Sequence, residues 1–234
     1  MPNERYGNDE TIPPTPEELR TDHHRFLDAI RSNWRGSPPG VDVLEALRRF
    51  GVLLYERSAS IALVARGDRE TLFTRHILDS LAVAQLFSCA PDRILDVGSG
   101  GGFPGIPLAI LWSHARVDLL ESRTRKCGFL EGAARKLKLA NVGVRCERIE
   151  DLVGGTRQDA YDTVCIRALS GLPSILAATR PVSKSGAVWI YFLGRNTSPE
   201  PTLSEISRAG FAGRHQTVPL GTEFLVGRYD GTRA

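Results

Sequence analysis

Short apolar runs alternate along the chain with longer segments in which apolar residues recur at every third or fourth position. Runs of Ile, Leu and Val predict strands buried on both faces, and the three-to-four spacing predicts amphipathic helices. The predicted strands cover residues 93–97, 115–121, 142–146, 161–168 and 187–192, and the predicted helices cover residues 16–33, a segment beginning at residue 41, and residues 71–87, 106–111, 123–139 and 172–178. This order predicts an α/β fold with a mostly parallel sheet.

The carboxyl-terminal part of the chain has a different pattern. Polar and apolar residues alternate over residues 214–220 and again over residues 223–229, with Gly221 between the two segments. Such segments around a glycine predict an antiparallel strand pair, which would close the sheet. The predicted fold class is therefore a Rossmann-like α/β sheet, mostly parallel with a C-terminal antiparallel pair, preceded by a helical extension.

The distribution of polar residues divides the chain into three regions. Residues 1–40 are polar and rich in proline, so we expect a partly disordered extension with low order before residue 14. Residues 41–90 should form helices that pack on the core, and residues 91–234 should form the main domain.

Two of the N-terminal helices carry specific signals. Asp42 and Glu45 are spaced like a capping box, which would begin the helix at residue 41. Gly51 is expected to interrupt or weaken that helix. The helix over residues 71–87 has one apolar face and is expected to pack on the sheet edge.

The composition is that of a globular protein, with 41% hydrophobic and 24% charged residues among 234. No run of about 18 apolar residues is present, so no membrane span is expected. The N-terminus has no apolar export segment, so a cytoplasmic location is expected. Cys89, Cys127, Cys146 and Cys165 form no Cys-x-x-Cys pair, which predicts reduced thiols rather than a zinc site or a disulfide framework.

The net charge of +3 is too small to indicate a nucleic-acid-binding protein by itself. Basic residues are nevertheless concentrated in one quarter of the chain: Arg123, Arg125, Lys126, Arg135, Lys136, Lys138, Arg145 and Arg148. This group could bind phosphates, or it could be a solvated helix face, and the sequence does not decide between the two.

The first predicted strand leads into a glycine-rich turn and then a helix. In this arrangement, backbone N–H groups and a helix N-terminus face a nucleotide. A Walker A loop is excluded because no Gly-Lys-Ser/Thr follows the glycines. A dinucleotide fingerprint fits poorly because it would begin at Gly100, beyond the end of the strand. The better alignment, Asp96-Val-Gly98-Ser-Gly100, resembles motif I of class I S-adenosylmethionine (SAM) methyltransferases.

Acidic residues follow the next two predicted strands. Glu121 lies about 20 residues beyond the glycine turn, where a carboxylate can accept hydrogen bonds from both ribose hydroxyls. The alternative for Glu121 is an acid that caps the helix after Ser122. Ile149 and Glu150 follow the third strand, where adenine-binding loops lie in this architecture, although Glu150 could instead be a surface acid.

Several segments together are similar to one family. They are Arg75-His-Ile-Leu-Asp-Ser80, the loop from Asp96 to Pro107, Leu119-Leu-Glu-Ser122, Lys126, Phe129-Leu130 and Cys165-Ile-Arg-Ala168. In order and spacing they resemble the RsmG (GidB) family, bacterial methyltransferases that modify a guanine N7 in 16S ribosomal RNA. The resemblance covers roughly residues 70 to 195 and implies SAM as the cofactor and 16S rRNA or the small ribosomal subunit as the partner.

The resemblance also implies a set of site residues. The cofactor would be bound by Asp96, Gly98, Gly100, Phe103, Glu121, Ile149, Glu150 and Arg167. Arg167 would face both the methyl donor and the substrate and is the candidate catalytic residue; its alternative is an ion pair at the sheet edge. Guanine N7 carries an unprotonated lone pair, so no general base is required, and alignment and polar groups should supply the catalysis.

The chain departs from the family pattern at two places. Residues 60–64 replace the usual Asn-Leu-Thr, and Leu193-Gly194 replaces Lys-Gly, with Arg195 one position later. Both places lie near the expected RNA side. His76 and Asp79 are one helical turn apart without a third ligand, so we expect a hydrogen-bonded pair that fixes the helix against the loop, and no metal site.

Three alternative functions remain at this stage. One is a SAM-dependent small-molecule methyltransferase with a lid formed by the N-terminal 70 residues. Another is an NAD-dependent dehydrogenase, which the Asp96 alignment disfavours. The third is a SAM-binding, ribosome-associated protein that has lost its chemistry. We expect a monomer because the sequence marks no self-complementary apolar face.

Overall fold

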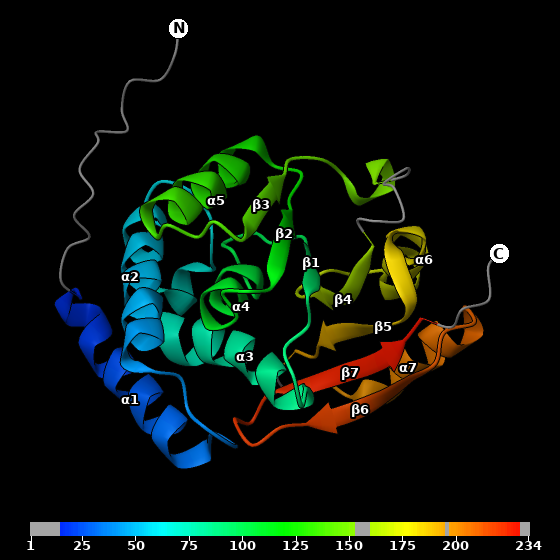
Figure 1. The fold of residues 1–234 in the computed structure, drawn as a ribbon, viewed down its shortest axis with the longest axis horizontal. Coiled ribbons are helices and arrows are strands. Elements are labelled where there is room, and N and C mark those ends of the chain that lie inside the picture. The colour runs from blue at the N-terminus through cyan, green and yellow to red at the C-terminus, as the bar shows by residue number, and fades with distance from the viewer. Residues whose placement is uncertain (1–14, 153–159, 195–196, 230–234) are drawn as a thin grey trace, which may run out of the picture.

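A seven-stranded sheet forms the centre of the molecule (Figure 1). The computed structural model describes residues 15–152, 160–194 and 197–229. The strands are β1 (Arg93–Val97), β2 (Arg116–Leu120), β3 (Val142–Arg145), β4 (Tyr161–Ile166), β5 (Ser183–Phe192), β6 (Gly213–Thr217) and β7 (Glu223–Arg228). Their order in the sheet is β3-β2-β1-β4-β5-β7-β6. Only β7 runs antiparallel, against both β5 and β6, so the predicted fold class and the C-terminal strand pair are confirmed.

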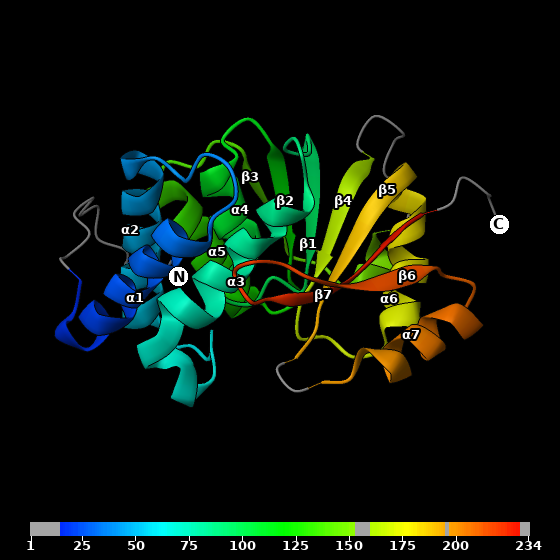
Figure 2. The same cartoon turned by 90° about the horizontal axis from the view of Figure 1, so that it is seen from below.

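Helices cover both faces of this sheet. Those on one side are α1 (Glu17–Asn33), α2 (Val41–Arg57), α3 (Leu78–Leu81), α4 (Gly105–Leu111) and α5 (Thr124–Lys136), and those on the other are α6 (Leu172–Thr179) and α7 (Pro199–Arg208) (Figure 2). The short turns are η1 (Arg66–Thr71), η2 (Phe73–Ile77), η3 (Ala82–Leu86), η4 (Ile149–Asp151) and η6 (Arg180–Val182). No described helix is long and apolar enough to cross a membrane.

The hydrophobic core has two parts, one between the sheet and each helix layer. Successive side chains of a strand point to opposite faces, so Ile94 packs with the α1–α5 layer while its neighbour Leu95 packs with the α6–α7 layer. Both residues are fully buried. Burial on both faces explains why the central strands have continuous apolar runs instead of an alternating pattern.

Helix α2 differs from the sequence prediction in two respects. It continues through Gly51 without a break. A Cβ atom at Gly51 would lie 2.5 Å from the ring of Phe73, so the glycine allows close packing and does not end the helix. The predicted capping box is also wrong: no side chain caps the helix after Gly40, and Glu45 instead binds Arg48, with two N–O distances of 2.7 Å.

The predicted helix over residues 71–87 is a chain of short helical pieces. A π-helical turn, η2, is followed by α3 and then by the 3-10 turn η3. Buried Asp22 of α1 accepts hydrogen bonds from the backbone N–H groups of Phe73 and Thr74 at the start of this segment. The segment packs on α1, α2 and α4 over one face of the sheet, and not on the sheet edge as predicted.

Helix α7 was not predicted from the sequence. Pro199 and Pro201 are the reason, because proline usually interrupts a helical pattern. Both lie in the first turn of α7, where proline is tolerated. The helix follows β5 and packs against α6 and β6. Residues 1–14, for which low order is predicted, lie outside the described residues. The domain boundaries after residues 40 and 90 stay predictions.

Candidate active site

The glycine turn lies between β1 and α4, at the centre of the sheet. The backbone N–H groups of Gly98 and Ser99 donate to the carbonyl oxygen of Leu120, at 2.8 and 3.0 Å, which ties the turn to the end of β2. Gly98 has φ = +71°, and a Cβ atom there would lie 2.8 Å from the side chain of Leu169. The positive φ favours glycine at this position, and a larger residue would also displace the Leu169 side chain.

Asp96 lies behind the turn and is fully buried. Its Oδ2 atom accepts a hydrogen bond of 2.9 Å from the N–H group of Gly105, the first residue of α4. Burial raises the pKa of the Asp96 carboxyl to about 7, because the charged form is not solvated there. Asp96 does not line the cavity described below, so the structure assigns it to holding the turn and α4 together rather than to contact with a ligand.

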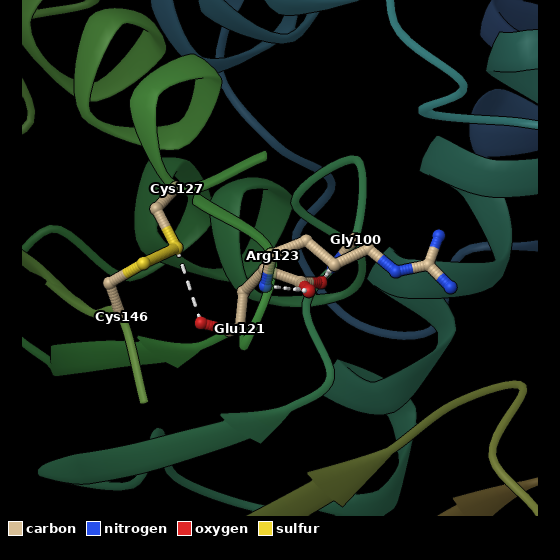
Figure 3. Close-up of a disulfide and its surroundings, with 5 residues drawn as sticks. All are labelled: Gly100, Glu121, Arg123, Cys127 and Cys146. Carbon is tan, nitrogen blue, oxygen red and sulfur yellow. Dashed lines mark hydrogen bonds between the residues drawn. A yellow bond between two sulfur atoms is a disulfide. The ribbon is translucent and has the colours of Figure 1, made fainter. Parts of the chain in front are cut away.

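Glu121 joins the glycine turn to the start of α5 (Figure 3). Its Oε2 atom accepts a hydrogen bond from the N–H group of Gly100, and its Oε1 atom accepts one from the N–H group of Arg123, both at 2.9 Å. The second bond goes to the N-cap residue of α5, and no side chain caps that helix, so Glu121 is not its N-cap acid and that alternative is wrong. Each carboxylate oxygen has further acceptor capacity, so Glu121 can also bind a ligand in the cavity that it lines.

A cavity of about 630 Å³ opens above the carboxyl ends of β1, β2 and β4. This volume is in the usual range for small-molecule sites. The sequence-predicted residues that line it are Gly98, Gly100, Phe103, Glu121, Ile149, Glu150 and Arg167. The tertiary structure thus brings together every predicted site residue except Asp96. Sequence reasoning did not identify Leu63, Asp68 and His76 as lining residues, because they come from segments far from the strand ends.

Arg167 follows β4 and lines the cavity, yet most of its guanidinium is bound by protein. Its Nη2 atom donates to the carbonyl oxygen of Arg75 at 2.9 Å and lies 3.3 Å from Asp79 Oδ2, while Nη1 donates to the carbonyl oxygen of His76 at 3.2 Å. Burial lowers the pKa of Arg167 from its usual value. Arg167 is therefore both an ion-pair partner and a lining residue, so the two sequence interpretations are compatible.

His76 and Asp79 do not bind each other, and that prediction is wrong. His76 Nε2 lies 3.2 Å from Asp68 Oδ2, and Asp79 Oδ1 accepts a hydrogen bond from the hydroxyl of Thr222. Both residues instead meet at Arg167. Burial, followed by the positive charge of Arg167, lowers the pKa of His76 to about 4. Within the described residues, no group of three or more His, Cys, Asp or Glu side chains could hold a metal ion.

Two of the cysteines are joined, which corrects the prediction of reduced thiols. Cys127 of α5 and Cys146, just after β3, form a disulfide across a sequence separation of 19 residues (Figure 3). Cys127 Sγ lies 3.2 Å from the backbone oxygen of Glu121, so the bond is next to the candidate site. The pairing depends on α5 packing beside β3, and no sequence spacing indicated it. Cys89 is exposed, and Cys165 is buried; both are free.

Part of the basic group lies at the cavity. Arg123, Lys126 and Arg148 line it, whereas Arg145 pairs with Glu147 at 2.5 Å. Of the departures from the family pattern, Leu63 and Val64 also line the cavity, and Leu193 is buried beside the start of β7. Arg195 lies outside the described residues.

Solved structures with this architecture support a fold assignment. A SAM-dependent methyltransferase from Aquifex aeolicus matches with a TM-score of 0.55 and 19% identity, over 68% of this chain and 92% of that chain. An O-methyltransferase from Bacillus cereus, solved in complex with SAH, matches with a TM-score of 0.53 and 16% identity, over 91% of this chain and all of that one. The strand order and the glycine turn are those of the class I SAM-dependent methyltransferases.

The chain belongs to the GidB family, described as rRNA small subunit methyltransferase G, whose family model matches residues 43–220. A ribosomal RNA small subunit methyltransferase G from Methylobacterium nodulans is 43% identical over 171 residues, which are 70% of this chain and 76% of the relative. The protein of the same description from Hydrogenovibrio crunogenus is 37% identical over 186 residues, covering 78% and 83%. The resemblance stated from the sequence motifs is confirmed.

Proposed function

We propose that this protein transfers the methyl group of SAM to N7 of a guanine in small-subunit (16S) ribosomal RNA. The observation that carries the proposal is the meeting of the glycine turn and the Glu121 carboxylate at one cavity, in a chain that belongs to the rRNA small subunit methyltransferase G family. The turn supplies the close backbone approach, and the carboxylate supplies acceptors for a cis-diol.

The residues around the cavity fit the parts of SAM. Glu121 accepts hydrogen bonds from the ribose hydroxyls, and Ile149 and Glu150 border the adenine. Gly98 and Gly100 allow the amino-acid part to approach the turn, and Phe103 provides an apolar wall. These assignments rest on the positions of the side chains around the cavity and on the acceptor capacity of Glu121.

The chain's own residues orient the reacting groups and do not transfer a proton. Methyl transfer from a sulfonium is an in-line displacement, and SAM supplies the electrophilic methyl group when it is bound. Guanine N7 needs no base, so Arg167 acts by aligning and polarising the acceptor purine beside the cavity. N7 lies in the deep groove of an RNA helix, so the target base has to be unpaired or splayed out.

Basic side chains at the cavity offer contacts for RNA phosphates. The lining contains four cations, Arg123, Lys126, Arg148 and Arg167, and four acids, Asp68, Glu121, Glu147 and Glu150, so it carries no net positive charge. Lysine and arginine attract the phosphate backbone independently of base sequence, and this attraction weakens as salt concentration rises. RNA affinity should therefore fall steeply with salt, whereas affinity for S-adenosylhomocysteine should change little.

The decisive experiment incubates the protein with methyl-labelled SAM and small ribosomal subunits that lack the modification. Label at a single guanine that becomes sensitive to borohydride supports the proposal. Absence of label in rRNA, with retained binding of S-adenosylhomocysteine, refutes the RNA assignment and favours a small-molecule acceptor or a non-catalytic binder. Free 16S rRNA in a parallel reaction tests which form of the substrate is used.

We further expect a monomer that works in the cytoplasm, where the proposed substrate is located. Among the described residues, Val41 is the exposed large hydrophobic side chain, with 81% of its surface accessible, and a single side chain does not form a self-association face. Sedimentation of the free protein tests the monomer.

A further inference from the structure

Residues 75–79 surround the Arg167 guanidinium with hydrogen-bond acceptors. The carbonyl oxygens of Arg75 and His76 accept from its two terminal nitrogens, at 2.9 and 3.2 Å. Side chains of the same segment add His76 Nδ1 at 3.1 Å and Asp79 Oδ2 at 3.3 Å from Nη2. Backbone and side-chain acceptors from a single segment therefore converge on one cation that follows β4.

The chemistry of the partners fixes the proton on His76. Arginine has no acceptor atom, so His76 Nδ1 has to accept the hydrogen bond from Arg167. The ring proton of the neutral imidazole then lies on Nε2, which faces Asp68 Oδ2 at 3.2 Å. Protonation of Nδ1 would place an N–H group against another donor. Burial lowers the pKa of His76 to about 4, which agrees with a neutral ring in this position.

Asp79 connects this segment to the turn between β6 and β7. One carboxylate oxygen faces Arg167, and the other accepts the Thr222 hydroxyl hydrogen bond at 3.0 Å. Thr222 lies in the turn between β6 and β7 and does not contact the cavity. Asp79 thus holds the Arg167 guanidinium without lining the cavity, whereas His76 and Asp68 also line it.

The remaining donor of Arg167 is the one available to a ligand. Among residues 15–152, 160–194 and 197–229, no acceptor takes a hydrogen bond from Arg167 Nε–H. The guanidinium carbon lies 5.6 Å from the centre of the Phe103 ring and 5.2 Å from that of Phe192, so aromatic rings also restrict its rotation. The side chain lines the cavity with one N–H group unused.

We propose that His76 and Asp79, with Asp68 behind His76, are positioning residues that orient Arg167 so that its free Nε–H addresses the methyl acceptor. The inference rests on the methyl transfer proposed above. A guanidinium held in place before the substrate arrives costs no reorganisation during the reaction, which is the condition under which a polar group contributes most to catalysis. A displacement of about 1 Å can lower the rate about a hundredfold.

The first test compares a variant of Asp79 with a variant of its other hydrogen-bond partner, Thr222. Asp79→Asn weakens the charge that faces Arg167, and Thr222→Val removes only the hydrogen bond on the other side with nearly the same volume. We expect Asp79→Asn to lower kcat on small subunits about tenfold or more with little change in the KM for SAM. Thr222→Val should keep kcat within about twofold. A kcat of Asp79→Asn within about twofold of that of the unmodified chain would overturn the positioning role.

The second test uses a double-mutant cycle with Arg167→Ala. If Asp79 and His76 act through Arg167, Asp79→Asn and His76→Ala lower kcat in the unmodified chain but have no further effect when Arg167 is already absent. His76→Asn keeps an acceptor near the position of Nδ1 and should recover part of the loss. An equal loss in both backgrounds would show a general structural role and would contradict the proposal.

Two controls separate this inference from the proposed function. Thermal unfolding and S-adenosylhomocysteine affinity of each variant show whether the fold and the cofactor site are intact. The exchange His114→Asn changes an exposed histidine and should leave kcat unchanged. If the unmodified protein labels no rRNA, the proposed function fails; if it labels rRNA and Asp79→Asn labels it equally fast, only the positioning role fails.

Discussion

The Glu121 carboxylate accepts a hydrogen bond of 2.9 Å from the backbone N–H group of Gly100, so the end of β2 is fastened to the glycine turn after β1. The two residues are 21 positions apart and meet because β1 and β2 are neighbouring parallel strands that end at the same edge of the sheet. The same side chain that is proposed to bind the ribose thus shapes the turn beside it.

Glu121→Gln should therefore weaken both the turn and the cofactor site. An amide in place of the carboxylate presents an NH₂ group to one of two backbone donors and loses the negative charge. We expect the affinity for S-adenosylhomocysteine to fall about tenfold or more and the free energy of unfolding to fall by about 1–3 kcal/mol. Calorimetry and urea denaturation measure these quantities. Glu131→Gln, at an exposed position of α5, is the matched control and should change neither.

Substitutions of Gly100 and Phe103, which line the cavity, should weaken cofactor binding. Gly100→Asp puts a carboxylate into the turn, where a Cβ atom would lie 3.8 Å from Lys126 Nζ, and Phe103→Ala removes an apolar wall, so both should weaken S-adenosylhomocysteine binding about tenfold or more. Gly100 has φ = +55°, which adds backbone strain. Gly36→Asp is the control for that strain, because Gly36 also has a positive φ (+76°) but lies away from the cavity. Unchanged affinity in both site variants would refute the site.

Arg167→Ala should mainly reduce turnover. We expect kcat on small subunits to fall about a hundredfold while the affinity for S-adenosylhomocysteine changes by less than about threefold, because Arg167 is proposed to act on the acceptor. Single-turnover kinetics with labelled SAM measure the chemical step. A variant with unchanged kcat and weakened cofactor binding would place Arg167 in the cofactor site instead. Arg180→Ala, on the other side of the sheet, serves as the control for arginine removal.

Asp96 and His76 should give opposite pH dependences of stability. The pKa of Asp96 is raised to about 7, so from about pH 4 to 7 the folded chain retains a proton there that the unfolded chain loses, and this contribution to the free energy of unfolding falls as pH rises. The pKa of His76 is lowered to about 4, so from about pH 6.5 to 4 the unfolded chain gains a proton that the folded chain excludes, and stability falls as pH falls.

These two slopes offset each other in the unmodified chain between about pH 4 and 6.5. Asp96→Asn removes one of them, so the free energy of unfolding of this variant should decrease as the pH is lowered through that range, at up to about 1.4 kcal/mol per pH unit. Urea denaturation at a series of pH values tests this. Asp151→Asn, at an exposed position, should retain the profile of the unmodified chain. The same slope in Asp96→Asn and in the unmodified chain would contradict the raised pKa of Asp96, and a flat profile for Asp96→Asn would contradict the lowered pKa of His76.

The Cys127–Cys146 disulfide should stabilise the part of the chain that borders the proposed adenine position. It closes a segment of 19 residues from α5 to the loop that contains Glu147. Cys127→Ser, or reduction with a dithiol, should lower the free energy of unfolding by about 3 kcal/mol. Cys89→Ser changes an exposed free cysteine and is the control. Mass spectrometry of an unreduced digest should find the two peptides joined, and separate peptides would contradict the bond.

Local signals in the sequence were sufficient for the sheet and most of the site. Glycines at 98 and 100 after an apolar run, and an acid after the next run, predicted a cofactor turn and its carboxylate. These residues line one cavity because parallel neighbouring strands end at one edge, so residues that follow strands in the sequence meet in space. Their contact with the cofactor stays a prediction. The same rule placed Arg167 at the cavity, because it follows β4 beside β1.

Contacts between distant segments were decided only by the tertiary structure. The Gly51 position in α2 depends on the ring of Phe73, and the disulfide depends on α5 packing against β3. His76 and Asp79 are one helical turn apart, but both bind Arg167, 91 and 88 residues away, instead of each other. Hydrophobic periodicity and turn-forming residues depend on positions that are close in the sequence, so the sequence alone shows them. A buried charge needs hydrogen-bond partners, and the fold supplies them from distant segments. The spacing of residues in the sequence therefore does not identify them.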